Sequence, residues 1–254
     1  MLAQTKSAQD NGIDGKEMQR RQFIKGASLM MAASIIAPTL QAKTSSPLSA
    51  AKTPFTTGKY RVLALVFDDY ETLDLHGPIE MLGHMPNTEI KLVAAKEIVS
   101  SYQGPRVLAD CLTEQTYDCD LLLIPGGLGT RTLVNDTELR QWLIAQIARS
   151  QNVFTICTGT ALLAMTSVLN DRKATTNKMA YEWVTSLNDN PQWQPKARWV
   201  FDGKFLTSSG VSAGTDAALF WIKQLHGDQE AKRIQILTEY DWNDNPHNDP
   251  YAVG

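Results

Sequence analysis

Cys157 has the sequence surroundings of a nucleophile. It ends the apolar run at residues 152–156 and is followed by Thr158 and Gly159, two small residues that open a predicted helix. A sharp turn of this kind, between a strand and a helix, pushes the side chain out of the sheet. At a helix N-terminus, free N–H groups and the helix dipole favour the thiolate, the nucleophilic form of cysteine. The alternative is an inert buried cysteine at a strand end.

A second group of residues could act on this thiol. Asp74 follows the first predicted strand, and a carboxyl group beside a thiol can exchange a proton with it, especially when burial raises the pKa of the carboxyl. Asp74 could instead cap a helix. The turn Pro125-Gly126-Gly127 follows a neighbouring strand. Its glycines leave N–H groups open to a ligand, so Gly127 and Thr158 form a candidate oxyanion hole, unless the glycines only make a tight turn.

The elements that must position these residues alternate between strand and helix patterns. Strands are predicted over short apolar runs, at residues 60–67, 89–95, 120–124 and 152–156. Helices are predicted where apolar residues have helical spacing, at residues 74–83, 136–150, 158–169, 212–225 and 229–237. Asp202-Gly203 lies between the short apolar runs 199–201 and 205–208, which predicts a hairpin.

This alternation predicts an α/β fold, with a flavodoxin-like, doubly wound, mostly parallel sheet, helices on both faces and a nucleophile elbow at Cys157. In such sheets, ligands bind at the carboxyl ends of the strands. The loops expected at that edge contain the residues suited to chemistry, at 68–76, 125–129, 157–160 and 208–214.

The first part of the chain has the pattern of an export signal. A twin arginine at residues 20–21 precedes an apolar stretch at residues 27–40 that is short for a bilayer span. These features are typical of a Tat signal peptide, with cleavage after Ala42 or Ala51. We therefore divide the chain into a signal peptide (1–42), a flexible lead-in (43–58), an α/β domain (59–240) and a C-terminal tail (241–254).

Composition and charge limit the partners. The net charge is −3, and no run of Lys or Arg follows the signal, so nucleic acid is not an expected partner. The Tat export machinery is an expected one. After processing, we expect a periplasmic or secreted protein without a stable membrane anchor. Cys111 and Cys119 could form a disulfide there, or remain two small buried residues.

Four ordered motifs resemble the ThiJ/PfpI family of the class I glutamine amidotransferase-like superfamily. They are Leu73-Asp74-Leu75-x-Gly77-Pro78, Pro125-Gly126-Gly127, Ile156-Cys157-Thr158-Gly159 and Ala174-Thr175-Thr176. The resemblance covers residues 60–240, and is strongest to isocyanide hydratases and the amidase-like domains of AraC-type regulators. It implies that Cys157 is the nucleophile, Asp74 its acid/base partner and Thr158 a residue that orients the site. It also implies a homodimer, with no metal and no organic cofactor.

The chain departs from this family at two places. PfpI proteases have His directly after the nucleophile, where this chain has Thr158, so a Cys-His-acid triad is not expected. In the hydratase-like branch, Ala-Thr-Thr precedes His-Trp, where this chain has Asn177-Lys178. Lys178 could therefore select an anionic ligand, or be a solvated helix lysine.

The segment 208–216 resembles the one that closes the family's pocket, and its glycines and serines permit close backbone approach to a ligand. The segment could also simply open the helix that starts at Ser212, with Ser as its N-cap. The residues expected to line the substrate pocket are Gly126, Asn177, Lys178, Gly210 and Val211.

Three functions fit these patterns. The first is a hydratase (a lyase) or hydrolase that acts on a small-molecule electrophile. In it, Cys157 attacks carbon, Asp74 transfers the proton and water completes the reaction; an isocyanide would give an N-substituted formamide. The second is redox sensing through oxidation of Cys157. The third is a ligand-binding domain without a DNA-binding module, because residues 241–254 are acidic and rich in turn formers.

Overall fold

The computed structural model describes residues 53–252. The predicted signal peptide and residues 43–52 of the predicted lead-in lie outside the described residues. No helix within the described range is long and apolar enough to cross a lipid bilayer.

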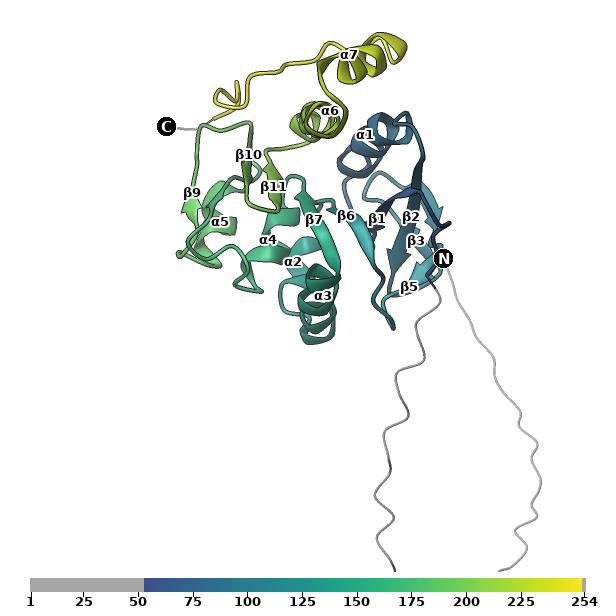
Figure 1. The fold of residues 1–254 in the computed structure, drawn as a ribbon. Coiled ribbons are helices and arrows are strands. Elements are labelled where there is room, and N and C mark those ends of the chain that lie inside the picture. Colours follow the sequence, from purple (N-terminus) through teal and green to yellow (C-terminus); the bar gives the residue numbers. More distant parts are fainter. Residues whose placement is uncertain (1–52, 253–254) are drawn as a thin grey trace, which may run out of the picture. The chain divides into compact units, whose positions relative to one another are not determined.

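The order of elements confirms the predicted alternation of strands and helices (Figure 1). The strands are β1 (Tyr60–Leu65), β2 (Thr88–Ala94), β3 (Ile98–Ser100), β4 (Arg106–Leu108), β5 (Cys111–Leu112), β6 (Cys119–Ile124), β7 (Ser150–Thr155), β8 (Lys173–Ala174), β9 (Gln192–Trp193), β10 (Trp199–Asp202) and β11 (Phe205–Ser208). The helices are α1 (Thr72–Gly83), α2 (Thr130–Leu133), α3 (Thr137–Arg149), α4 (Gly159–Ala164), α5 (Tyr181–Ser186), α6 (Ser212–His226) and α7 (Asp228–Leu237).

The main sheet has seven strands in the order β10-β11-β7-β6-β1-β2-β5. Its neighbours pair in parallel except for the antiparallel hairpin β10–β11. Figure 1 shows α1 and α6 on one side of this sheet and α3 and α4 on the other. The predicted flavodoxin-like α/β fold is therefore confirmed, with β1 at the point where the strand order reverses.

Burial on both faces explains why the central strands are continuous apolar runs. Leu63 in β1, Leu122 in β6 and Phe154 in β7 are all fully buried. Parallel strands covered by helices on both sides have no solvent face, so they need no polar alternation. Because these strands run parallel, their carboxyl ends come together at one edge of the sheet, the edge where ligand-binding loops were expected.

Three local predictions are wrong at their boundaries. The helix after Cys157 ends at Ala164 rather than at residue 169, because Ser167 adopts a positive φ of 62° and the Thr166 hydroxyl donates to Leu163 O. Helix α1 begins at Thr72 rather than at residue 74, which places Pro78 in its interior. Val211, not Ser212, occupies the N-cap position of α6. By contrast, Asp136 caps α3 by accepting from the Leu139 N–H at 2.9 Å.

Both ends of the described chain pack against the domain. Phe55 is buried, and the Thr56 N–H donates to Glu89 Oε2 at 2.7 Å, so this part of the predicted flexible lead-in is held in place. The C-terminal segment, residues 241–252, runs from α7 back past β10 (Figure 1). It is fastened there by a hydrogen bond from the Arg198 N–H to Pro246 O, 2.8 Å long.

Candidate active site

The backbone at Cys157 makes the predicted elbow. Cys157 lies two residues after Thr155, the last residue of β7, and has a φ of 57°, an uncommon conformation for a residue with a side chain. Its N–H donates to two carbonyl oxygens at the end of β11, those of Ser208 (3.2 Å), the last residue of the strand, and Ser209 (3.0 Å). The turn is tightened by the Gly159 N–H, which donates to Ile156 O at 2.8 Å. Positive φ at a cysteine costs backbone strain, and such strain clusters at functional sites.

Asp74 reaches the same edge of the sheet from the first turn of α1. The loops that precede α1 and follow β6 are joined by the Glu71 N–H, which donates to Gly126 O at 2.8 Å. In return, the Gly126 N–H donates to Asp74 Oδ2 at 3.0 Å. A Cβ at Gly126 would lie 2.9 Å from that oxygen and 2.5 Å from the Thr158 nitrogen, so only glycine fits here. Asp74 is fully buried and is not the helix N-cap, which is Glu71.

The carboxyl group of Asp74 is poised to hold a proton. Burial raises its pKa to about 7, although hydrogen bonding with the Cys157 thiol and with the N–H groups of Gly126 and Val211 acts in the opposite direction. Its Oδ1 has no well-aligned hydrogen-bond donor among the described residues. Because no cation within residues 53–252 compensates its charge, Asp74 can alternate between carboxylate and carboxylic acid near neutral pH.

The thiol of Cys157 does not have the lowered pKa expected from the helix N-terminus. Only 6% of the residue is exposed, and this burial raises the thiol pKa, as does the negative charge of Asp74. The Thr158 N–H and the Asn177 amide lower it, but do not reverse the direction. With six residues, α4 is too short to offset the loss of solvation. Cys157 therefore needs a base that takes its proton, and Asp74 is the neighbouring candidate.

Asn177 is the polar side chain that donates to the sulfur. Its Nδ2 lies 3.2 Å from Cys157 Sγ, and its Oδ1 accepts from the Ala180 N–H at 2.9 Å, which fixes which end of the amide faces the thiol. Gly210 packs against this amide, where an added Cβ would lie 2.5 Å from Nδ2. The predicted pocket residue Asn177 thus contacts the Cys157 sulfur.

The predicted oxyanion donors are partly committed to each other. The Gly127 N–H donates to Thr158 Oγ1 at 2.9 Å, and the Thr130 hydroxyl donates to the same oxygen at 3.1 Å. The Thr158 N–H faces the Cys157 sulfur, whose pKa it lowers. Gly127 and Thr158 therefore meet as predicted, but as partners that fix the elbow, not as two free donors.

The predicted pocket residues divide into two groups. Gly126 and Val211 donate N–H groups toward Asp74, while Asn177 and Gly210 lie on the sulfur side of the site. Val211 has a φ of 36° at the start of α6, the second strained residue of the site. These four residues surround the Cys157–Asp74 pair.

Lys178 is the exception. Only 5% of it is exposed, so it is not a solvated lysine, and its ammonium donates to Thr175 Oγ1 (2.8 Å) and Ala197 O (2.6 Å). Burial lowers its pKa to about 8, which the charge of Asp249 partly opposes. Its donors are used within the protein, because a buried ammonium needs acceptors to replace water. Lys178 therefore supports the wall behind Asn177 instead of selecting an anion.

Sequence reasoning overlooked the buried charges near this edge. Arg198, Asp216 and Asp249 are buried together, although no spacing in the sequence marks them as a group. The other two cysteines, Cys111 and Cys119, are free thiols in the structure. Within residues 53–252, no cluster of three or more His, Cys, Asp or Glu side chains could hold a metal ion.

Comparison with known proteins gives a consistent family. The model of the DJ-1/PfpI family matches residues 60–224. The chain is 30% identical over 177 residues to an isonitrile hydratase of Pseudomonas putida, covering 69% of this chain and 76% of that protein. A crystal structure of a ThiJ/PfpI family protein from Pseudomonas syringae superimposes with a TM-score of 0.67 at 26% identity, covering 81% of this chain and 85% of that one. Oxidized DJ-1 of Toxoplasma gondii gives a TM-score of 0.60 at 25% identity, over 72% of this chain and 100% of the other.

Proposed function

The chain belongs to the DJ-1/PfpI family, and within it we propose an exported, cysteine-dependent hydratase or hydrolase that acts on a small electrophile. The observation that carries the proposal is the position of the Cys157 sulfur, between the Asn177 amide at 3.2 Å and the buried, proton-accepting carboxyl of Asp74. The similarity to an isonitrile hydratase supports isocyanides as the substrate class.

The proposed reaction begins with a proton transfer from Cys157 to Asp74. It is needed because the raised pKa of Cys157 keeps the thiol protonated, and the raised pKa of Asp74 makes its carboxylate a suitable acceptor. As the sulfur attacks the terminal carbon of an isocyanide, the thiol proton passes to the Asp74 carboxylate, so no free thiolate has to accumulate in the buried site. Asp74 then delivers this proton to the same carbon. The product is a thioimidate that links Cys157 to the substrate, and the Asp74 carboxylate is regenerated.

Water completes the reaction. Asp74 takes a proton from a water molecule as its oxygen adds to the thioimidate carbon. Asp74 passes this proton to the substrate nitrogen, which gives a neutral tetrahedral adduct. As the carbon–sulfur bond then breaks, the remaining proton of the added hydroxyl moves to the sulfur, so the carbonyl of the formamide forms and the Cys157 thiol is restored. The sum is one isocyanide plus one water giving one N-substituted formamide, with no oxidant or reductant. The Asn177 amide stabilises the sulfur each time it carries negative charge, as an attacking and as a leaving group.

Redox sensing receives less support from the same geometry. Peroxides oxidise the thiolate rather than the thiol, and burial together with the charge of Asp74 keeps Cys157 protonated. A proton-coupled attack suits a protonated thiol better than spontaneous oxidation does. We therefore keep the hydratase or hydrolase as the proposed function.

The proposed location follows from the sequence of the N-terminal region. The twin arginine at residues 20–21 and the short apolar stretch after it support export by the Tat route into the periplasm or beyond. A homodimer is part of the same proposal, by resemblance to the family.

The test is a screen of isocyanides, glyoxals and small amides against the purified protein, with Cys157→Ala as the blank. We expect turnover of at least one isocyanide to its formamide, and none above background with Cys157→Ala, because no other thiol reaches the site. Cys111→Ala is the matched control, since that thiol lies away from the elbow, and it should retain full activity. Turnover in Cys157→Ala equal to that of the unaltered protein would contradict the proposal.

A further inference from the structure

A buried cation lies next to the elbow but takes no part in the proposed chemistry. Arg198 precedes β10 and is only 5% exposed. Its Nε and Nη2 both donate to Asp216 Oδ2, at 2.7 and 2.5 Å, and Nη2 also reaches Ser212 Oγ at 3.2 Å. Both acceptors belong to the first turns of α6. Arg198 thus fastens the start of the helix whose N-cap, Val211, faces Asp74.

The C-terminal segment closes over this ion pair. Trp242 Nε1 donates to Asp216 O at 3.0 Å, and the Asn243 N–H donates to Asp216 Oδ1 at 3.1 Å. The carboxylate of Asp249 lies 3.9 Å from Arg198 Nη1 and is itself buried. The Asp249 N–H is held by Lys196 O at 2.9 Å. The segment therefore seals the Arg198–Asp216 pair from water.

A continuous run of backbone hydrogen bonds leads from this segment to the nucleophile. The Arg198 N–H donates to Pro246 O at 2.8 Å, the Ser209 N–H donates to Arg198 O at 2.8 Å, and the Cys157 N–H donates to Ser209 O at 3.0 Å. The middle link extends the β10–β11 hairpin, and the other two join segments that are distant in sequence. A displacement of Arg198 would therefore move the carbonyl that holds the elbow at Cys157.

We propose that Arg198 is a positioning residue for the nucleophile elbow and that the C-terminal segment, through Asp249 and Pro246, holds it in register. Arg198 acts on the site through two contacts. Its carbonyl binds the Ser209 N–H, and the Ser209 carbonyl holds the backbone of Cys157. Its side chain holds the first turns of α6, at whose start Val211 faces Asp74. A buried ion pair by itself is weak evidence that it stabilises the fold. The proposal therefore depends on the position of the Arg198–Asp216 pair between these two contacts.

The test measures how readily the Cys157 thiol is alkylated by iodoacetamide, read by mass spectrometry on the peptide that contains Cys157. This reaction needs no substrate, so its outcome is separable from that of the proposed function. In Arg198→Lys, which keeps the charge but loses the two-pronged contact with Asp216, the loosened elbow exposes the thiol. We expect alkylation at about pH 7 to become about tenfold faster, since one unit of thiol pKa is a tenfold change in thiolate. In the same variant, kcat should fall by a larger factor than KM rises.

The controls separate positioning from general loss of structure. Arg61→Lys alters another Arg–Asp pair, at the opposite edge of the sheet, and should lower the Tm while leaving Cys157 alkylation unchanged. Asp249→Asn is a milder variant, expected to speed alkylation about threefold, and it decides the matter if Arg198→Lys does not fold. The proposal is overturned if folded Asp249→Asn and Arg198→Lys are alkylated like the unaltered protein. It is equally overturned if Arg61→Lys speeds alkylation as much as they do.

Discussion

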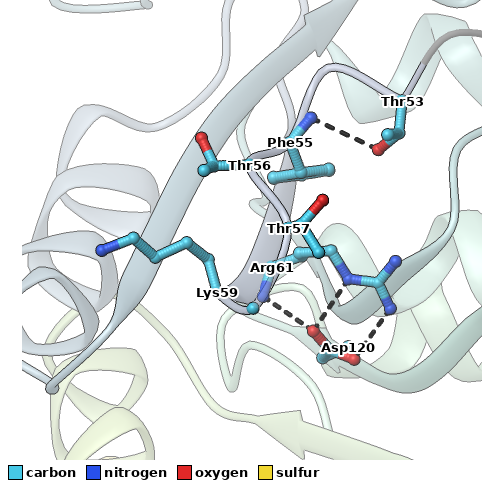
Figure 2. Close-up of a pocket in the computed structure, with 8 residues that line it drawn as sticks. Thr53, Phe55, Thr56, Thr57, Lys59, Arg61 and Asp120 are labelled. Atoms are coloured by element: carbon cyan, nitrogen blue, oxygen red, sulfur yellow. Dashed lines mark hydrogen bonds and ion pairs between the residues drawn. The ribbon is translucent and has the colours of Figure 1, made fainter.

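Each of the two edges of the sheet carries an aspartate, and the surroundings of the two aspartates are opposite in charge. At the carboxyl edge, Asp74, in the first turn of α1, is fully buried and accepts from the Gly126 N–H, with no cation of the described residues beside it. At the amino edge, Asp120 in β6 accepts from the backbone N–H, Nε and Nη2 of Arg61, at 2.8, 3.0 and 3.0 Å (Figure 2). The same residue type is thus placed near a thiol in one case and near a guanidinium in the other.

The two aspartates consequently differ in their pKa. Burial raises the pKa of Asp74 to about 7. Burial acts in the same direction on Asp120, but the hydrogen bonds and charge of Arg61 outweigh it, so the pKa of Asp120 is lowered. Asp120 stays a carboxylate and stabilises the fold, whereas Asp74 can exchange a proton near neutral pH. Placement at an edge of the sheet therefore does not by itself raise the pKa of an aspartate. Among the described residues, Asp74 differs from Asp120 in having no cation that compensates its charge.

The amino edge also shows that a cavity alone is not a site. A cavity of about 340 Å³ lies there, lined by residues 53, 55–59 and 61 together with Asp120 (Figure 2). Two of its charged groups, Arg61 and Asp120, are paired with each other, and no cysteine lines it. The carboxyl edge, by contrast, brings together a thiol, a carboxyl with a raised pKa and two strained backbone positions, Cys157 and Val211.

Neutralising each aspartate in turn should separate the two edges most clearly. Asp74→Asn should reduce turnover by about 10²–10⁴-fold, because it removes the group that accepts the thiol proton. Asp120→Asn should leave turnover within about twofold of normal, since its carboxylate contacts no group at the elbow. Steady-state rates of formamide formation measure both. Equal losses in the two variants would show that the edges are not distinguished as described.

The same pair of variants should change stability in opposite directions. The pKa of Asp74 is about 7 in the folded chain and 3.8 by reference. Between these pH values, the folded state keeps a proton that the unfolded state has lost. Asp74 therefore lowers the free energy of unfolding as pH rises, by up to about 4 kcal/mol above pH ~7. Asp74→Asn should thus be more stable than the unaltered protein at pH ~8, and no longer so at pH ~4.

For Asp120, the lowered pKa reverses the sign. Its contribution to stability is present above the reference pKa and is lost as pH falls through the lower folded value. Because the pair is partly exposed to solvent, Asp120→Asn should cost only about 1 kcal/mol at neutral pH. Urea unfolding at several pH values measures both variants. A stability loss in Asp74→Asn at pH ~8 would refute the raised pKa of Asp74.

A smaller effect is expected from the asparagines of the two edges. Asn177→Ala removes the amide that lies 3.2 Å from Cys157 Sγ and should lower kcat about tenfold. Asn152→Ala removes a side chain whose amide donates to Asp120 O at 3.4 Å, at the amino edge, and should leave kcat unchanged. Initial rates with a common isocyanide compare the two. If Asn177→Ala affects only KM, its amide contacts the substrate rather than the sulfur.

Local sequence patterns predicted correctly those elements whose structure depends mainly on their own residues. The apolar runs at β1, β6 and β7 are continuous because both faces are covered, and the Asp136 cap of α3 depends on contacts within a single helical turn. The short strands β3, β4, β5, β8 and β9 escaped prediction. Two or three residues carry too little periodicity, and their pairing depends on neighbours that are distant in sequence.

Local sequence patterns were enough to predict a cysteine on an elbow after a buried strand. They also predicted Asp74 and a glycine turn at the same edge, because parallel strands align their carboxyl ends. The tertiary structure decided how these groups are charged. Burial of Cys157 beside Asp74 raises both pKa values, reversing the low thiol pKa expected from the helix N-terminus. The packing of the chain also buries Lys178 and brings the Asn177 amide to 3.2 Å from the Cys157 sulfur. Desolvation and charge proximity depend on all the segments that surround a group, and no local pattern records them.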